Sequence, residues 1–374
     1  MKKLRFLPVL LFAAISCSPL GQDPDAPVDG LLSLSDVAKI MSELPLSEEN
    51  LDEVYMAVSS SSGNGYDEEY TMSSLFSAPG SGVGDDSPYT KAAAVSRPLK
   101  DLFAEYFASS KALTKSASDV EAYLNALSSS DMQIYWPYSD AWDGSSFPLV
   151  TFDPGQNAES NYGYEIRYDD RGVKVVDSVL VTEELAMKRP VWVINRNADA
   201  SYTPVQFFET KATASPKSGR MLMIKDFTAY RHYDSWFAGA SEFIIRSGAV
   251  DGFKAATDDE LRKYSPTVTD FVMVVKRKDI GRKLPLNAIM LADLTDQMET
   301  LALLITEDDG GTTTNWKCSA NVKYNSKSYG FDIDIPYRSR DDIVWRGPVP
   351  ASFFGTGGTV NGRFGDVGIT FELR

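Results

Sequence analysis

The sequence predicts a mainly β member of the α+β class, with a helical N-terminal region followed by antiparallel β regions, the last of them sandwich-like. Apolar residues recur at helical spacing between residues 31 and 130, whereas short apolar runs with period-two alternation follow from about residue 131. The chain of 374 residues is 43% hydrophobic and 24% charged, a composition typical of a globular protein with a large core. We therefore expect a helical region at 31–130, a β region at 131–215 and a β-sandwich at 216–374.

Four apolar stripes with i, i+3, i+4, i+7 spacing predict four amphipathic helices in the N-terminal region. Ser47 directly precedes Glu48 and Glu49, a pattern typical of the first turn of a helix. We expect the stripes to pack against one another or against the next region; a partner-binding groove is the alternative. The stripes are Val37, Ile40, Met41 and Leu44; Leu51, Val54, Tyr55 and Val58; Leu99, Leu102, Phe103 and Tyr106; and Val120, Tyr123, Leu124 and Leu127.

Residues 59–88 separate the second stripe from the third and are rich in Gly and Ser. Such a composition predicts neither a helix nor a strand. The segment is expected to be either a flexible loop or an ordered strap. The side chains available to hold a strap are Tyr66, Tyr70, Leu75 and Phe76.

Short strands bounded by turn residues are predicted after residue 131. Residues 169–172 (Asp-Asp-Arg-Gly) are typical of a hairpin turn, and residues 197–219 of a long loop or linker. Strict alternation at 331–335 and 367–373 indicates strands with one buried face. The other predicted strands are Ile134–Trp136, Leu149–Phe152, Tyr164–Tyr168, Val173–Val181, Val191–Ile194, Leu222–Tyr230, Glu242–Arg246, Asp270–Lys276, Leu301–Thr306 and Trp316–Tyr324.

The first 16 residues predict a cleavable export signal. A positively charged start is followed by an apolar stretch, Phe6–Ile15, that is too short to span a bilayer. The ending Ala-Ile-Ser-Cys resembles the lipobox of bacterial lipoproteins, although Ala14 stands where Leu is usual. The resemblance implies lipidation of Cys17, which would make residues 17–30 a tether; an ordinary secretory signal is the alternative.

Other segments are similar to uncharacterised Bacteroidetes lipoproteins. The acidic patch at Gln22, Asp23 and Asp25 resembles their surface-export signal, which implies a lipid anchor in the outer membrane and exposure at the cell surface. The resemblance also covers SSSSGNGYDEEYTMSSLF, MQIYWPYSDAW and VWVINRNADASY. It implies a location in the cell envelope and no particular activity.

The charge of the chain excludes one class of partner. The formal net charge is −15, and loss of the three basic residues of the signal would make it −18. Such a surface repels phosphate backbones, so a nucleic-acid partner is not expected. The charge instead suits a cation or a basic protein.

No catalytic motif is present in the sequence. The single histidine, His232, excludes multi-histidine metal sites, and there is no Walker motif and no G-x-S-x-G motif. A glycoside hydrolase needs only two carboxylates, but 52 acidic residues leave the pair unidentified. We therefore assign no catalytic residue and no required cofactor.

Residues 132–144 contain the richest aromatic cluster and the first candidate ligand site. Exposed rings stack on the C–H faces of sugars or on peptide side chains, and neighbouring aspartates accept hydroxyl hydrogens. The alternative is that the rings form a core where the helices meet the sheet. The candidates are Tyr135, Trp136, Tyr138 and Trp142.

Glu307, Asp308 and Asp309 are candidate calcium ligands at the end of a predicted strand. Clustered carboxylates on a loop at the end of a sandwich can bind calcium through oxygen, and Glu242 or Asp234 would complete the site if the loops converge. The arrangement resembles calcium-dependent sandwich modules of the protein kinase C type, without their full set of aspartates. The alternative is a solvated hairpin turn, because Asp-Asp-Gly-Gly favours turns.

Together these features favour a lipid-anchored envelope protein that binds a glycan or a protein without catalysis. The alternatives are a surface hydrolase with a carboxylate pair and a structural or adhesin component of the envelope. A structural component is expected if the aromatic cluster is fully buried and the surface has no cleft.

Overall fold

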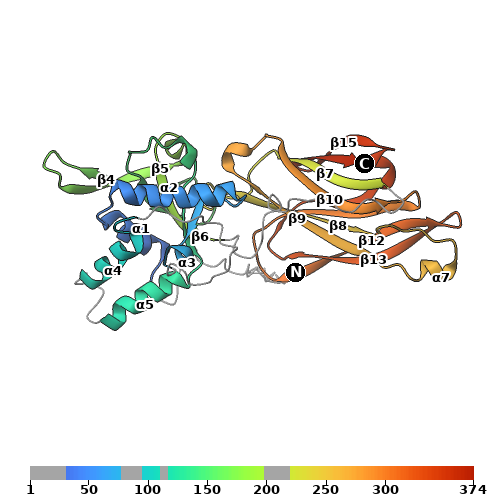
Figure 1. The fold of residues 1–374 in the computed structure, drawn as a ribbon, viewed down its shortest axis with the longest axis horizontal. Helices are drawn as coiled ribbons and strands as arrows, with labels where there is room; N and C mark the ends of the chain where they lie inside the picture. Colours follow the sequence, from blue (N-terminus) through green and yellow to red (C-terminus); the bar gives the residue numbers. More distant parts are fainter. Residues whose placement is uncertain (1–30, 77–94, 110–116, 198–219) are drawn as a thin grey trace, which may run out of the picture.

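The computed structural model describes residues 31–76, 95–109, 117–197 and 220–374. They form two bodies side by side along the long axis of the molecule, an N-terminal body of helices and one sheet and a C-terminal body of strands (Figure 1). The predicted signal, the tether with Cys17, residues 77–88 of the Gly- and Ser-rich segment and nearly all of the 197–219 loop lie outside the described residues.

The four predicted amphipathic helices are confirmed, and their polar starts explain where they begin. Ser33 caps the first helix, its backbone N–H donating to Asp36 while its hydroxyl accepts from the Asp36 N–H. At the second, the side-chain oxygen of Asn50 accepts from Ser47 N at 3.1 Å. The helices are α1 (Leu34–Glu43), α2 (Glu48–Gly63), α3 (Met72–Phe76), α4 (Leu99–Ser109), α5 (Ala117–Ser128), α6 (Glu183–Ala186) and α7 (Asp258–Leu261).

The N-terminal body contains one six-stranded sheet in the order β1-β2-β6-β3-β4-β5. Its pairs are antiparallel except for β3 and β6, which run parallel, a departure from the antiparallel arrangement that the sequence predicts. The turn predicted at 169–172 joins β4 to β5, with Gly172 at φ +73°. The strands are β1 (Glu69–Thr71), β2 (Met132–Tyr135), β3 (Leu149–Phe152), β4 (Ser160–Tyr168), β5 (Lys174–Thr182) and β6 (Val191–Arg196).

The helices and this first sheet share one hydrophobic core. The apolar stripes of α1, α2 and α4 pack with Trp136, Trp192 and Ile194 of the sheet segments, so the stripes face the interior. A second cluster lies around Leu149, Val191 and Val193, and it receives side chains from the C-terminal body.

The C-terminal body is the predicted β-sandwich. One sheet has the order β10-β7-β16-β15; the other has the order β13-β12-β11-β8-β9, with β14 also paired to β11. Its strands are β7 (Arg220–Ala229), β8 (Ser241–Ala249), β9 (Thr267–Val275), β10 (Leu284–Leu294), β11 (Met298–Glu307), β12 (Thr313–Tyr324), β13 (Lys327–Arg338), β14 (Asp342–Pro350), β15 (Gly358–Phe364) and β16 (Val367–Leu373).

Strand β11 is buried on both faces. Leu301, Leu303 and Ile305 point into the core between the two sheets, whereas Ala302 and Leu304 pack against the β12–β13 hairpin. The hairpin approaches β8 so closely that a Cβ on Gly248 would lie 2.9 Å from the Ile333 side chain. The hairpin therefore forms a third layer on the sandwich.

Two local predictions are wrong. Residues 59–76 do contain elements, because α2 continues to Gly63 and β1 and α3 follow; of the two alternatives the ordered strap fits better, since Tyr70 and Leu75 are buried. Residues 308–312 are not a tight hairpin turn, because β11 pairs with β12 only near its start, at Met298 and Thr300, whereas its end pairs with β8 and β14. The chain crosses here from the middle layer to the outer hairpin.

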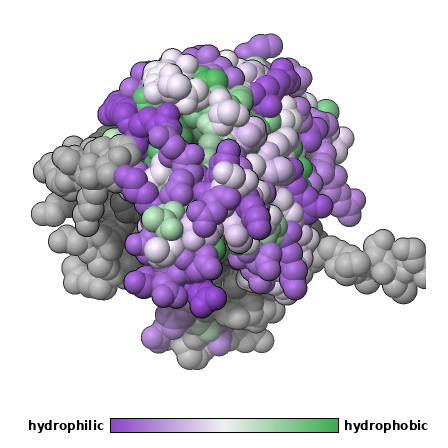
Figure 2. Space-filling model, turned by 90° about the vertical axis from the view of Figure 1, so that its right-hand side faces the viewer, coloured by the Kyte–Doolittle hydropathy of each residue, from purple (hydrophilic) through white to green (hydrophobic). Residues whose placement is uncertain are grey.

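The end of the molecule formed by the sandwich is mainly hydrophilic, with small scattered apolar patches (Figure 2). This view agrees with the acidic composition of the chain. Within the described residues, no helix combines the length and the apolar character that crossing a membrane requires.

Candidate functional site

An open groove of about 450 Å³ lies on the N-terminal body. Its lining comes from three stretches of chain, at 136–147, 166–168 and 186–190. They include the 3₁₀ helix η1 (Ser139–Ala141), the end of β4 and the turn between α6 and β6. A groove of several hundred Å³ with aromatic and a few polar side chains is the usual form of a small-ligand site.

The predicted aromatic cluster is divided between the core and this groove. Tyr135 and Trp136 are each 1% exposed, so neither offers a free ring face. Tyr138 and Trp142 are half-buried and line the groove. The core alternative therefore holds for the first pair, because Tyr135 at the end of β2 and Trp136 directly after it each pack into an apolar cluster.

Trp142 is held rigidly at the groove. Its ring centroid lies 5.2 Å from that of Tyr55 and 5.3 Å from that of Trp136. Its indole N–H donates to the carbonyl oxygen of Ser146 at 3.0 Å. The exposed part of the ring is thus fixed in place before any ligand arrives, which lowers the entropic cost of binding.

Two further aromatic rings, which were not predicted from the sequence as site residues, line the groove. Phe147 and Tyr168 pack edge to face with centroids 5.5 Å apart, and Tyr168 is 44% exposed. The Tyr168 hydroxyl donates to the Leu46 carbonyl oxygen at 3.3 Å. Their separation along the chain hides them from sequence reasoning; the one local signal is an aromatic residue directly before the turn at 169–172.

Polar groups of both signs border the rings. Hydrogen bonds from Ser146 and then Ser145 lower the pKa of Asp143 to about 2, so this carboxylate is ionised and acts as an acceptor. Lys188 and Arg189 lie on the α6–β6 side of the groove and are exposed. The arrangement can stack a ring-shaped ligand and exchange hydrogen bonds with its hydroxyls.

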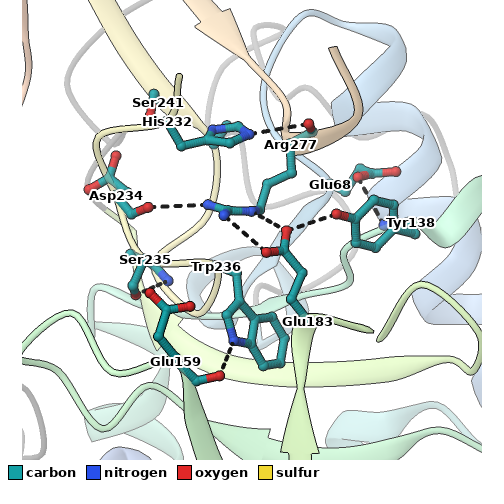
Figure 3. A network of polar contacts seen from close by, with 12 residues as sticks. Glu68, Tyr138, Glu159, Glu183, His232, Asp234, Ser235, Trp236, Ser241 and Arg277 are labelled. Carbon is teal, nitrogen blue, oxygen red and sulfur yellow. Dashed lines mark hydrogen bonds and ion pairs between the residues drawn. The ribbon is translucent and has the colours of Figure 1, made fainter. Parts of the chain in front are cut away.

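A second group of polar residues lies where the two bodies meet, centred on Arg277 (Figure 3). The Arg277 guanidinium forms an ion pair with Glu183 at 2.5 Å and donates to the Asp234 carbonyl oxygen at 3.1 Å. The Tyr138 hydroxyl donates to the same Glu183 carboxylate at 2.8 Å. Because Tyr138 also lines the groove, this network links the groove to the junction.

Apolar contacts also join the bodies. Trp236 and Phe237, from the loop between β7 and β8, enter the apolar cluster on the first sheet, with their ring centroids 3.9 Å apart. The Trp236 indole N–H donates to the Glu159 carbonyl oxygen at 3.1 Å. The amide of Asn195 donates to the carbonyl oxygens of Phe237 and Ala238 at 3.0 and 2.7 Å.

Three consecutive acids, Asp67, Glu68 and Glu69, are buried near the junction, in the segment for which the sequence predicts no element. Asp67 accepts from the Ala240 N–H at 2.8 Å, and Lys278 lies 3.4 Å from Glu68. Burial raises the pKa of Glu68 and the nearby Asp67 adds to the rise, whereas Lys278 opposes it. Only the fold shows that these acids are buried, because the same three residues in an exposed segment would simply form a solvated turn.

Three carboxylates from separate elements converge at the end of the sandwich. Asp234 lies in the β7–β8 loop, Glu242 in β8 and Glu307 at the end of β11, and one oxygen from each lies within 4.8 Å of the others. Strand pairing explains part of this, because Glu307 is opposite Phe243, next to Glu242. Glu242 and Asp234, the residues that the sequence offered to complete a site with Glu307, thus do lie next to it.

The other two predicted calcium candidates are placed differently. Asp308 is nearly buried, accepts from the Gly310 N–H at 2.9 Å and lies 3.5 Å from Arg338. Asp309 is exposed. Both border a second cleft, of about 370 Å³, that also includes Asp234 and Glu242 and opens between the two bodies. Of the three neighbours, only Glu307 belongs to the converged group.

No known protein family, curated protein or solved structure matches this chain. Its function therefore has to be argued from the geometry and chemistry of the two clefts.

Glu307, the third member of the converged group, does not line the second cleft but is buried next to Asp234 and Glu242, which do. It is 0% exposed, and neither carboxylate oxygen accepts a hydrogen bond from an N–H or hydroxyl group of the described residues. Burial raises its pKa far above the ordinary value, and contact with the Asp234 carboxyl raises it further. Without a bound cation, such a group stays protonated.

Proposed function

We propose that this protein is a lipid-anchored, non-catalytic protein of the cell envelope that binds a glycan in the groove of its N-terminal body. The observation that carries the proposal is the set of fixed, partly exposed rings of Trp142, Phe147 and Tyr168 along one open groove. Flat rings suit the apolar faces of sugar units, and the bordering Asp143 and Lys188 suit their hydroxyls.

The size and openness of the groove favour a glycan over a folded protein partner. A volume of about 450 Å³ accommodates a few sugar units, whereas a stable protein interface covers about 800 Å² on each partner. A protein ligand, which the sequence leaves open, would therefore have to enter as a peptide.

The anchor rests on the sequence alone. A positive start, a short apolar stretch and Cys17 support lipidation, and the acidic patch after it supports a place in the outer membrane at the cell surface. Mass spectrometry of the native protein tests this part, because an acylated Cys17 at the mature N-terminus is expected. An unmodified N-terminus would contradict it.

A surface hydrolase is the alternative from another class. Asp143 is the one carboxylate among the residues that line the groove, whereas glycoside hydrolysis needs two. A hydrolase would thus need carboxylates outside this groove, such as those of the second cleft. A purely structural component is less favoured, because Tyr138 and Trp142 are not fully buried and border a groove.

Glycan-array screening of the purified protein, followed by calorimetry with the best ligand, tests the proposal. We expect Trp142→Ala and Tyr168→Ala each to weaken binding about tenfold, the equivalent of about 1.4 kcal/mol. Tyr162→Ala is the matched control, because Tyr162 is 66% exposed on the same hairpin and does not line the groove.

Two outcomes would overturn the proposal. One is that no glycan binds while a peptide does, or that the groove variants bind as tightly as the control. The other is that reducing ends accumulate when the protein is incubated with the bound glycan, which would favour the hydrolase.

A further inference from the structure

We propose that Asp234, Glu242 and Glu307 form a binding site for a divalent cation of the calcium type at the base of the second cleft. The site is separate from the glycan groove, and the proposal does not depend on the proposed function. It rests on the convergence of three carboxylates and on the burial of an uncompensated one.

The spacing of the three oxygens fits a calcium ion. They lie within 4.8 Å of one another. Oxygens that bind one calcium ion at about 2.3–2.6 Å are at most roughly 5 Å apart, so all three carboxylates can reach the same ion. Carboxylate oxygens are also the ligands that hard cations such as calcium prefer, whereas softer metals such as zinc favour nitrogen and sulfur.

The state of Glu307 is a second observation that points to a ligand. Its side chain is completely buried, and it lacks any N–H or hydroxyl donor from the described residues. One oxygen of Asp234 is likewise buried without a donor. An uncompensated buried carboxylate is costly, and a bound cation removes that cost directly.

The positive side chains nearby are already engaged elsewhere. Arg277 donates to the backbone carbonyl of Asp234 and pairs with Glu183, and Arg338 lies next to Asp308. Within the described residues, no lysine or arginine nitrogen lies within 4.0 Å of the carboxylates of Asp234 or Glu307. Asp234 and Glu307 therefore have no ion pair with a lysine or arginine of the described residues.

The cleft provides both access and room for the remaining ligands. It has about 370 Å³ and is open, so an ion with several waters can enter and complete a coordination number of six to eight. Gln133 lines the same cleft, and its buried Oε1 has no hydrogen-bond donor among the described residues. The bodies that border the cleft are fixed by the contacts of Arg277 and Trp236.

The rival explanation is a proton shared between Asp234 and Glu307. A shared proton would lower the repulsion between the two groups and would leave no need for a metal. The two explanations differ in their response to calcium, which only a cation site binds.

Differential scanning calorimetry of the purified protein, stripped with EDTA and then titrated with CaCl₂, separates them. At a hundredfold excess over Kd we expect the melting temperature to rise by about 5 °C. Calorimetry should give one calcium per chain and weaker binding of magnesium. No shift with up to about 10 mM calcium, above the Kd range of extracellular calcium modules, would overturn the proposal.

Glu307→Gln tests the assignment of the residues. The amide keeps the shape of the side chain and removes its charge, so we expect the variant to melt no lower than the wild type in EDTA and to lose the calcium response. Asp332→Asn is the control, because it makes the same change at an exposed position on β13 and should keep the response.

A second variant keeps the test decisive if Glu307→Gln does not fold. Glu242→Gln should lower calcium affinity at least tenfold. Full calcium binding by either folded variant would show that the ion binds elsewhere and would refute the site.

Discussion

Trp236 joins the two bodies, so we expect its replacement by alanine to separate their unfolding. The side chain is 1% exposed and lies in an apolar cluster whose other members, apart from Phe237, belong to the N-terminal body. Each body also has a larger core of its own. Truncation should therefore weaken the coupling between the bodies more than either core.

The size of the effect follows from burial and one hydrogen bond. Truncating a fully buried tryptophan costs about 3–5 kcal/mol, which includes the cavity left behind. Trp236→Phe keeps an aromatic ring and loses the N–H that donates to Glu159 at 3.1 Å, so its cost should be about 1–2 kcal/mol. Stability is thus expected to increase from Trp236→Ala to Trp236→Phe to the wild type.

Guanidinium unfolding followed by circular dichroism and by tryptophan fluorescence measures the effect. We expect coincident transitions for the wild type and two separated transitions for Trp236→Ala. Trp345→Ala is the control, because Trp345 is a partly buried residue that packs against the sandwich core and is not part of the cluster at the junction. A single transition for Trp236→Ala, with a loss below about 1 kcal/mol, would refute this account of the junction.

Three further predictions concern single side chains. Arg277→Gln should lower the free energy of unfolding by about 2 kcal/mol, because it leaves Glu183 without its ion pair. A double-mutant cycle with Glu183→Gln should give a coupling energy above about 1 kcal/mol, and a value near zero would contradict the pairing. Burial lowers the pKa of Lys174 to about 8, so between pH 8 and 10.5 the unfolded chain binds more protons than the folded one and the free energy of unfolding should rise with pH. In Lys174→Met this rise should be smaller by about 1–2 kcal/mol after allowance for solvent screening. Equal pH dependence of the two proteins in denaturant titrations would disprove the prediction. Burial raises the pKa of the Cys318 thiol to about 11, so it should react with a disulfide reagent at pH 8 at least tenfold more slowly than after unfolding; equal rates would count against this burial.

The fold class could be predicted because its signals are local. The stripes of α1, α2, α4 and α5 follow helical spacing, and the alternation in β13 and β16 follows the pleat of a strand with one buried face. Strands β10, β14 and β15 were missed, because the burial of β10 is irregular and because β14 and β15 are largely exposed and contain Gly or Pro. These three strands form because each pairs with a more buried strand, β7, β11 or β16.

The candidate sites could be predicted only in part, for a different reason. A cluster such as residues 132–144 is visible in the sequence, but burial by β2 decides which of its rings reach the surface. Phe147 and Tyr168 meet only because a hairpin returns to the same groove. Likewise Glu307 was selected as part of an acidic run, whereas its neighbours in space, Glu242 in β8 and Asp234 in the β7–β8 loop, lie 65 and 73 residues earlier in the chain.

The double-sided burial of β11 has a consequence for how the protein tolerates mutation. Strands with one wet face accept polar substitutions at every second position, but β11 has no such position from Leu301 to Ile305. A charge at Leu303 would disrupt the space between the sheets, and one at Leu304 would detach the outer hairpin. Random mutagenesis with selection for folded protein should therefore find this strand the most restricted stretch of the C-terminal body.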